Sequence, residues 1–484
     1  MSESLKSKTV KGVGWSFADN IASAGVSFLV GLVLANLLTP EEYGILAIIM
    51  IFIAVSNSII DSGFSSALIR KTDCKPIDYN TTFYFNLGVS IVLYIILYLT
   101  APYIAIFFHE PILNDVTRVI SWILIINALA IIPRTMFVKS IDFKTQTKVS
   151  LISSILSGII GIGMALYGMG VWSLVWQQLS RQILNTSFLW FYCSWRPKWE
   201  FSLNSFRNLF GFGSKLMLSG LLDTVWREIY YIVIGKFYSS AQLGQYTRAQ
   251  QFSTIFSSNL TTVIQRVSFP VLSTIQDDPI RLREGYRRII KISMLVTFSC
   301  MLGLAAVAKP MILILIGEKW TPAITYLQII CLSSMLYPLH AINLNILQVK
   351  GRSDIFLKLE IIKKIIGVGP IILGVFYGIE PMLWGGVVTS IISYYLNSYY
   401  SAQMIQYSTW NQIKDILPTF IIASIVAIIM WCLTYFALPM GLILIFQICI
   451  GIILAFCLFE KTKLSEYIEI KDLVLNTIHY KTIK

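Results

Sequence analysis

Residues 219–235 have the sequence SGLLDTVWREIYYIVIG, a stretch that is long and apolar enough to cross a bilayer. It nevertheless carries Asp223, Arg227 and Glu228 near its middle. A charge at the bilayer centre costs ~2.5–3.5 kcal/mol on insertion scales, so such a group normally faces the protein interior or a water-filled cavity. Asp223 and Arg227 are four residues apart, which also allows an intrahelical ion pair. The stretch therefore predicts a membrane helix that carries functional or mutually neutralised charges.

The rest of the chain has the same apolar character. Hydrophobic residues make up 56% of the 484 residues and charged residues 13%, whereas a soluble domain needs more polar surface. A helical span needs about 20 mostly apolar residues, and the polarity does not alternate as in barrel strands. The sequence predicts an all-α integral membrane protein with about 14 transmembrane helices. The expected spans are 13–37, 44–69, 79–101, 117–138, 149–167, 171–194, 214–237, 245–272, 288–308, 323–347, 356–377, 382–404, 416–436 and 440–459.

The basic residues indicate the orientation of the chain. The formal net charge is +13, and most of the 38 Lys and Arg residues fall in alternate loops when the N-terminus is cytoplasmic. This asymmetry follows the positive-inside rule and accounts for the charge without nucleic acid as a partner. We therefore expect a multi-pass protein of the bacterial plasma (inner) membrane with both termini in the cytoplasm.

Two halves of the sequence resemble one another. LANLLTPEEYGILA (34–47) matches IGKFYSSAQLGQYT (234–247) with Gly44 opposite Gly244, and YGMG at 167 matches YGIE at 377. Several matches in the same order predict two six-helix repeats related by an axis along the membrane normal, with a cavity between two lobes that rock. The predicted parts are an N-terminal lobe 1–195, a cytoplasmic connector 196–212, a C-terminal lobe 213–407, a two-helix extension 408–460 and a cytoplasmic tail 461–484.

Polar side chains within the spans are the candidate site. Arginine recognises phosphate and carboxylate because its planar fork donates paired hydrogen bonds and stays charged, which favours an anionic or polyhydroxylated substrate. Each arginine taken singly is equally well explained by a structural salt bridge, and those near span ends can reach the cytoplasmic face. Candidate substrate-binding residues are Arg227, Arg181, Arg266, Arg134, Asn20 and Gln265. Candidate proton- or sodium-coupling residues are Asp19, Asp61, Asp223 and Glu228.

Motifs of enzymes and cofactor sites do not occur in the sequence. There is no G-x-x-x-x-G-K-[ST] loop, no H-E-x-x-H, no G-x-S-x-G and no cluster of His and Cys. We therefore predict no cofactor, no metal, no ATP hydrolysis and no enzymatic activity. His340 lies among apolar neighbours, which favours a hydrogen-bonded core histidine over a proton relay.

Four segments resemble a known family. They are PRTMFVKSIDFKTQTKVS (133–150), IGKFYSSAQLGQYTRAQQ (234–251), VIQRVSFPVLSTIQDDPIRLREGYRR (263–288) and GEKWTPAI (317–324). These are similar to the polysaccharide transporter branch of the multidrug/oligosaccharidyl-lipid/polysaccharide (MOP) flippase superfamily, especially exporters of colanic-acid and teichuronic-acid units and Wzx-type O-antigen flippases. Tyr230 and Tyr231 stand where relatives often carry an acidic and amide pair.

The resemblance implies a function and two alternatives to it. It implies a two-lobed bundle that moves undecaprenyl-diphosphate-linked oligosaccharide between leaflets through a cationic cavity, alongside glycan polymerase or assembly proteins. A multidrug antiporter would share the fold but prefer cationic cargo, which the buried arginines disfavour. A membrane polymerase or ligase would need a sizeable external loop, and the predicted external loops are short.

Overall fold

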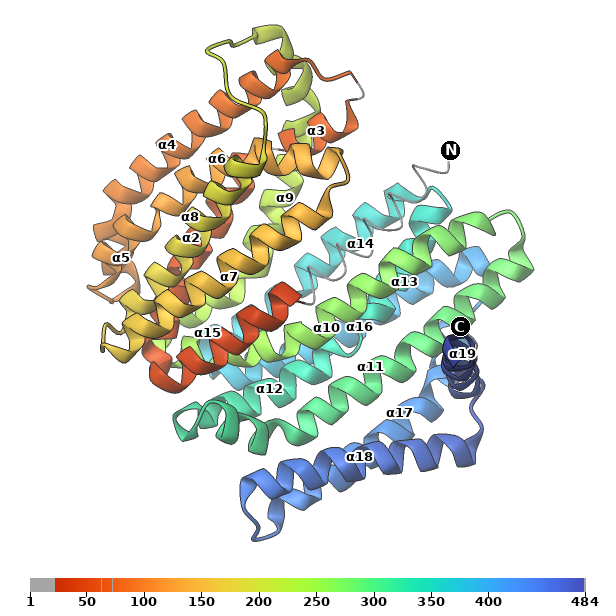
Figure 1. Ribbon diagram of the computed structural model, residues 1–484. Coiled ribbons are helices and arrows are strands. Elements are labelled where there is room, and N and C mark those ends of the chain that lie inside the picture. Colours follow the sequence, from red (N-terminus) through yellow and green to blue (C-terminus); the bar gives the residue numbers. More distant parts are fainter. Residues whose placement is uncertain (1–21, 62, 72, 483–484) are drawn as a thin grey trace. The chain divides into compact units, whose positions relative to one another are not determined.

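The computed structural model describes residues 22–61, 63–71 and 73–482 (Figure 1). All regular structure in these ranges is helical, which confirms the predicted all-α class. Within the same ranges, eight helices or helix pairs are long and apolar enough to cross a membrane. Where their residues are described, the other predicted spans also fall on helices, among them three whose sequences carry more polar residues: α8 (Val171–Tyr192), α9 (Leu203–Phe237) and α10 (Ser240–Thr274). The total of fourteen spans stays a prediction.

The chain divides into two compact units, residues 1–244 and 245–484. Unit 1 contains a helix over Ala22–Leu37, α2 (Pro40–Asp61), α3 (Phe64–Arg70), α4 (Pro76–Phe108), α5 (Leu113–Ile120), α6 (Trp122–Lys139), α7 (Phe143–Leu166), α8, α9 and the start of α10. Unit 2 contains the rest of α10, α11 (Pro279–Leu315), α12 (Thr321–Ser334), α13 (Tyr337–Val349), α14 (Ser353–Ile366), α15 (Val368–Tyr377), α16 (Ile379–Ile405), α17 (Thr409–Cys432), α18 (Met440–Thr462) and α19 (Ser465–Thr482).

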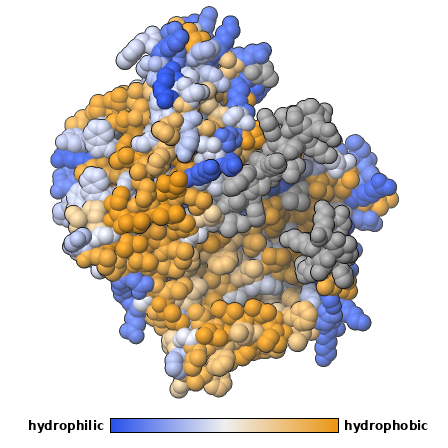
Figure 2. Space-filling view, in the orientation of Figure 1, coloured by the Kyte–Doolittle hydropathy of each residue, from blue (hydrophilic) through white to orange (hydrophobic). Residues whose placement is uncertain are grey.

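Apolar side chains cover wide areas of the visible surface (Figure 2). Many are large residues within helices that meet the criteria for a span, such as Leu99 of α4 at 64% exposed and Ile452 of α18 at 66%. Exposed apolar areas of this extent are unusual in soluble monomers but are the surface that meets lipid in a membrane protein.

Matched glycines of the two repeats play matched structural roles. A Cβ on Gly44 of α2 would lie 1.7 Å from the carbonyl oxygen of Ser240, and a Cβ on Gly244 of α10 would lie 1.8 Å from that of Pro40. The contact is reciprocal, because each glycine faces the residue four positions before the other. Gly168 and Gly378, the second matched pair, both have positive φ, at 74° and 120°. Glycine is favoured at each of these positions, and the repeat read from the sequence has a structural basis.

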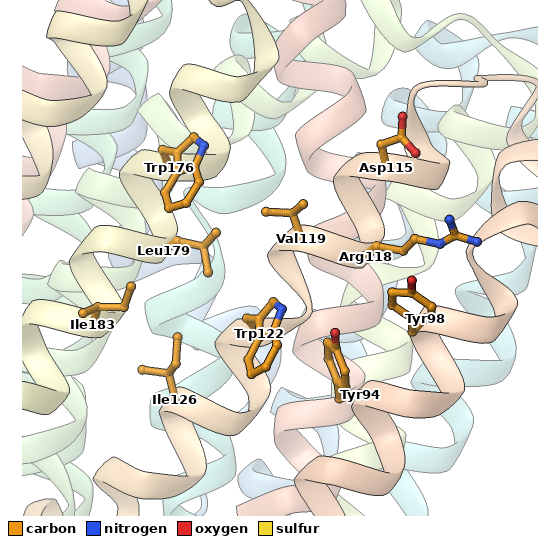
Figure 3. Close-up of a pocket in the computed structure, with 10 residues that line it drawn as sticks. All are labelled: Tyr94, Tyr98, Asp115, Arg118, Val119, Trp122, Ile126, Trp176, Leu179 and Ile183. Carbon is orange, nitrogen blue, oxygen red and sulfur yellow. The ribbon is translucent and has the colours of Figure 1, made fainter.

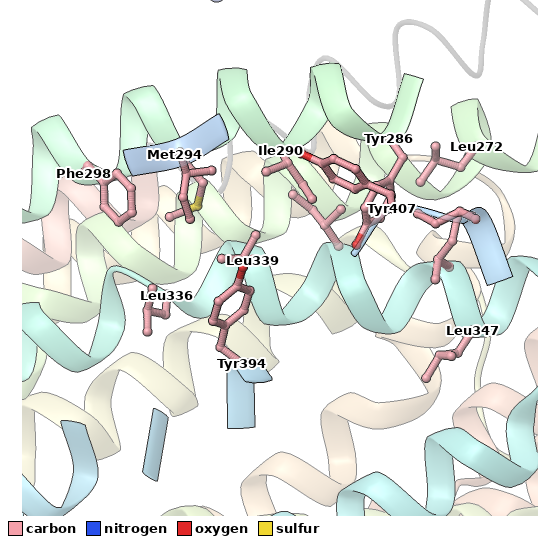
Figure 4. Packing of buried hydrophobic residues seen from close by; sticks show 14 of the residues in the cluster. Leu272, Tyr286, Ile290, Met294, Phe298, Leu336, Leu339, Leu347, Tyr394 and Tyr407 are labelled. Atoms are coloured by element: carbon pink, nitrogen blue, oxygen red, sulfur yellow. The ribbon is translucent and has the colours of Figure 1, made fainter. Parts of the chain in front are cut away.

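The core of unit 2 is built of buried apolar side chains, among them Leu272, Ile290 and Met294 (Figure 4). It also encloses a polar cluster. Asn343 of α13 accepts hydrogen bonds at its Oδ1 from the Tyr286 hydroxyl at 2.7 Å and from the Ser401 hydroxyl at 2.6 Å, and all three residues are fully buried. Buried polar groups are stable when they are hydrogen-bonded, so these contacts fix the relative positions of α11, α13 and α16. Nearby, the ring of His340 contacts Ser390 at 3.1 Å and Asn397 at 3.4 Å, which confirms the hydrogen-bonded core histidine.

Helix α19 is held to unit 2 by a buried carboxylate. The Glu466 side chain is 1% exposed; its Oε2 lies 2.8 Å from Nζ of Lys291 on α11, and its Oε1 accepts a 2.8 Å hydrogen bond from Thr419 on α17. Burial raises the pKa of this carboxyl, but the hydrogen bonds from Lys291, its own backbone amide and Thr419 outweigh burial and lower the pKa below its ordinary 4.5. A second pair, Arg288 with Glu469, lies one turn further along α11 and α19.

This carboxylate predicts a pH-dependent attachment of α19. A group with a lowered folded pKa contributes stability above its unfolded pKa, and that stability is lost as pH falls through the folded value. We expect hydrogen exchange at the backbone amides of α19, corrected for intrinsic rates, to be constant from pH 8 to 5 and to accelerate below about pH 4. Glu466→Gln should exchange faster already at pH 7 and show little further acid effect, unlike Asp472→Asn on the exposed side of the same helix. The same acid acceleration in Glu466→Gln as in the native protein would contradict the assignment.

Candidate functional site

Three amide side chains connect three helices of unit 1. Asn127 of α6 donates through Nδ2 to Oδ1 of Asn57 on α2 at 2.8 Å, and Gln182 of α8 donates through Nε2 to Oδ1 of Asn127 at 3.1 Å. All three residues are partly accessible, so the row, here called the amide ladder, is not sealed in the core. Amides between membrane helices hold the helices together and offer both donors and acceptors to a polar ligand.

Two charged candidates lie on the same helices as members of the amide ladder. The ladder and these two charges together are here called the polar stripe. Asp61 is one turn beyond Asn57 on α2, and Arg134 is two turns beyond Asn127 on α6, so each pair shares a helix face. The charges of Asp61 and Arg134 interact, Asp61 accepts a 2.5 Å hydrogen bond from Ser65, and both side chains are exposed. Arg134 therefore lies within the electrostatic influence of an acid and remains accessible. Arg181, the third candidate in this part of unit 1, is half-buried beside Gln182.

Helix α9 contacts α2 and then carries Asp223, Arg227 and Glu228, here called the charged turn of α9. A Cβ on Gly220 would lie 3.6 Å from Oγ of Ser58, the neighbour of Asn57, and Thr224 one turn later is buried. Nη2 of Arg227 lies 3.4 Å from Oγ1 of Thr224, and its charge interacts with Glu228. The side chains of Arg227 and Asp223 are exposed, and Asp61 and Arg134 are accessible in the same unit.

The remaining candidates belong to unit 2 or fall outside the described residues. Gln265 and Arg266 lie exposed on the part of α10 that belongs to unit 2. Asp19 and Asn20 lie outside the described residues. The structure therefore assembles Asp61, Arg134 and the amide ladder in unit 1, adds the charged turn of α9, and leaves the other predicted contacts as proposals.

Sequence reasoning overlooked two features. Amides at positions 57, 127 and 182 were not singled out, although an amide inside an apolar span is itself a sign of helix contact. Arg248 lies near the predicted external end of the span 245–272 but is 5% exposed, with its guanidinium carbon 5.8 Å from the Trp320 ring centre. Gln245 donates to the carbonyl of Lys319 at 2.7 Å in the same region. Residues 245–248, within the resemblance segment 234–251, thus pack against the segment 317–324.

Three relatives of this chain are named as proteins of polysaccharide biosynthesis or transport. The chain is 25% identical to the teichuronic acid biosynthesis protein TuaB of Bacillus subtilis over 73% of each chain. It is 24% identical to the lipopolysaccharide biosynthesis protein WzxC of Escherichia coli, covering 88% of this chain and 89% of the relative. It is also 24% identical to the succinoglycan biosynthesis transport protein ExoT of Rhizobium meliloti, covering 81% and 80%.

Solved structures share the fold. The lipid II flippase MurJ in an inward closed conformation matches with a TM-score of 0.74 at 16% identity, covering 96% of this chain and 100% of that one. An inward-facing multidrug resistance MATE family transporter of the MOP superfamily matches with a TM-score of 0.62 at 14% identity, covering 81% and 100%. The predicted membership of the polysaccharide transporter branch is confirmed. Because the model of the family described as "Polysaccharide biosynthesis protein" matches residues 33–325, more than half of the chain, this protein belongs to that family.

Proposed function

We propose that this protein moves undecaprenyl-diphosphate-linked oligosaccharide repeat units from the inner to the outer leaflet of the bacterial plasma membrane, for the synthesis of surface polysaccharide. The observation that carries the proposal is the row of accessible polar groups on membrane helices of unit 1: the amide ladder, Asp61, Arg134 and the charged turn of α9. Relatives whose printed names refer to teichuronic acid, lipopolysaccharide and succinoglycan support the class of cargo.

The chemistry of the cargo matches these groups. A diphosphate sugar cannot cross hydrocarbon unaided, since each unpaired polar group costs several kcal/mol there. Guanidinium groups bind diphosphate oxygens through paired, charge-assisted hydrogen bonds, and amides both donate to and accept from sugar hydroxyls. The lipid tail stays in the bilayer during the passage, so only the headgroup needs a polar path.

The proposed cycle is alternating access by two lobes, residues 1–195 and 213–407, joined by the connector 196–212. Residues 408–460 add two spans, and the tail 461–484 and the N-terminus lie in the cytoplasm, as the distribution of basic residues favours. Arg181, Arg266, Gln265 and Asn20 extend the substrate path, while Asp19, Asp61, Asp223 and Glu228 are the candidates for coupling to a proton or sodium ion. The protein performs no bond chemistry itself and hands its cargo to glycan polymerase or assembly proteins.

The decisive experiment locates the lipid-linked oligosaccharide in cells that lack this protein. We expect the glycolipid to accumulate on the cytoplasmic leaflet, measured by its resistance to a membrane-impermeant glycosidase added to spheroplasts, and the native gene to relieve the accumulation. Unpolymerised glycan on the outer face would place the protein after flipping and refute the proposal. Retention of cationic dyes without glycolipid accumulation would instead indicate a multidrug antiporter.

A further inference from the structure

Unit 1 also contains a pocket that is separate from the proposed substrate path. It has a volume of 640 Å³ and lies between α4, α5, α6 and α8 (Figure 3). None of the candidate substrate or coupling residues lines it. Its lining residues are Tyr94, Tyr98, Asp115, Arg118, Val119, Trp122, Ile126, Trp176, Leu179 and Ile183.

The lining changes in polarity along the helices. The charged groups, Asp115 and Arg118, come from α5, the short helix before the span of α6. The aliphatic residues Ile126 and Ile183 lie deeper along α6 and α8, and the four aromatic residues lie at several levels from the rim down to that of Ile126 (Figure 3). A charged rim above an aromatic and aliphatic interior matches the change from headgroup to acyl chain in one leaflet of a bilayer. The positive-inside rule assigns this end of unit 1 to the outer face.

The pocket is open to the lipid-facing surface. Trp122 is 48% exposed and Trp176 42%, although both belong to predicted spans. In Figure 3, Trp122 and Tyr94 lie side by side, with ring centres 4.9 Å apart. Aromatic rings at this depth are the usual contacts of the glycerol and headgroup region of a lipid.

The rim holds a cation that lacks an anionic partner. The guanidinium of Arg118 lies 4.8 Å from the centre of the Tyr98 ring, and among the described residues its buried Nε has no hydrogen-bond acceptor and the side chain forms no ion pair. Asp115, one turn away on the same helix, is exposed and accepts a 3.0 Å hydrogen bond from Asn114. The rim thus offers one positive and one negative group that do not neutralise each other by direct contact.

We propose that this pocket is a binding site for a zwitterionic phospholipid whose headgroup carries a primary ammonium, as phosphatidylethanolamine does. Arg118 binds the phosphate, Asp115 and the neighbouring aromatic rings receive the ammonium, and an acyl chain lies on Ile126 and Ile183. The presence of both a positive group, Arg118, and a negative group, Asp115, at the rim determines which class of lipid fits. A polyprenyl diphosphate or an anionic phospholipid would meet the repulsion of Asp115, whereas a headgroup with one charge of each sign matches the rim.

The test measures lipids bound to the purified, delipidated protein by native mass spectrometry, with phosphatidylethanolamine and phosphatidylglycerol supplied in equal amounts. We expect one tightly retained phosphatidylethanolamine, a loss of about tenfold in its apparent affinity in Arg118→Gln, and a shift of preference toward phosphatidylglycerol in Asp115→Asn. Arg281→Gln, which changes an exposed arginine of α11 in unit 2, should behave like the native protein. Equal retention of both lipids, unchanged by Arg118→Gln and Asp115→Asn, would overturn the proposal.

A second measurement places the acyl chain. Phosphatidylethanolamine with brominated chains should quench part of the tryptophan fluorescence, and Trp122→Phe with Trp176→Phe should remove that part. Quenching that persists undiminished in the double variant would mean that the bound chain lies elsewhere. Neither experiment uses a glycan substrate, so each result is independent of the proposed flippase activity.

Discussion

Gly44→Leu and Gly244→Leu are each expected to abolish the accumulation of folded protein in the membrane. The first side-chain atom would lie 1.7 Å or 1.8 Å from a backbone carbonyl oxygen, far inside the ordinary contact distance, and backbone cannot swing aside as a flexible side chain can. Overpacking of this kind costs roughly 3 kcal/mol or more, a large share of the stability of a typical protein. Even Gly44→Ala should be strongly destabilised, because alanine already carries the clashing atom.

The measurement is the yield and thermal midpoint of the monodisperse peak in size-exclusion chromatography of a fluorescent fusion. Gly88→Ala is the matched control, because Gly88 lies within a helix of the same unit and has no atom within 4 Å of its would-be Cβ. Alanine has the higher helix propensity, so Gly88→Ala should be neutral or more stable by up to about 1 kcal/mol. If Gly44→Ala matched Gly88→Ala in yield and midpoint, the close reciprocal contact would be wrong.

Arg227→Ala is expected to reduce export of lipid-linked oligosaccharide by tenfold to a hundredfold while leaving the amount of folded protein unchanged. The side chain is exposed and its guanidinium contacts Thr224 at 3.4 Å, so its removal disturbs little packing. A hydrogen bond to a charged group contributes about 1.5–3 kcal/mol, which corresponds to this range of effect. Arg227→Lys keeps the charge but loses the paired donors, so its activity should fall between the native protein and alanine.

The readout is glycolipid on the cytoplasmic leaflet in cells that express each variant in place of the native protein. Arg281→Ala is the control, because Arg281 is also a cation on a long helix but its side chain is 78% exposed at the start of α11. Full export by Arg227→Ala would remove this arginine from the substrate path, although the flippase assignment would then still rest on the deletion experiment.

The sequence allowed the helical architecture to be predicted because membrane spans are determined by local composition. Residues 219–235, despite their three charges, lie within α9 as expected, and the matched glycines 44 and 244 occupy equivalent positions. The start of α9 was harder to place. It begins at Leu203, within the range predicted as connector, because the apolar and aromatic residues of 203–212 continue the helix before the predicted span begins at residue 214. Composition alone does not mark that point.

The candidate site depended on contacts between distant segments, which composition does not encode. Asp61 and Arg134 stand out in the sequence as charged groups within predicted spans, but their interaction joins residues 73 positions apart. The amide ladder escaped notice for the same reason, since each of its members is unremarkable until three helices meet. Arg248 differs from the prediction in the opposite way. It lies near a predicted loop and was expected to be exposed, but it is buried and packs on Trp320, which is distant in the sequence.

The amide ladder also constrains how the protein is made. Asn57 and Asn127 are synthesised and inserted well before Gln182, whose amide completes the row. A chain that stops after α6 leaves the side-chain oxygen of Asn127 without the donor that α8 supplies. We therefore expect the row to be completed only after α8 has been inserted, so that the helices of unit 1 that carry it reach their final packing together.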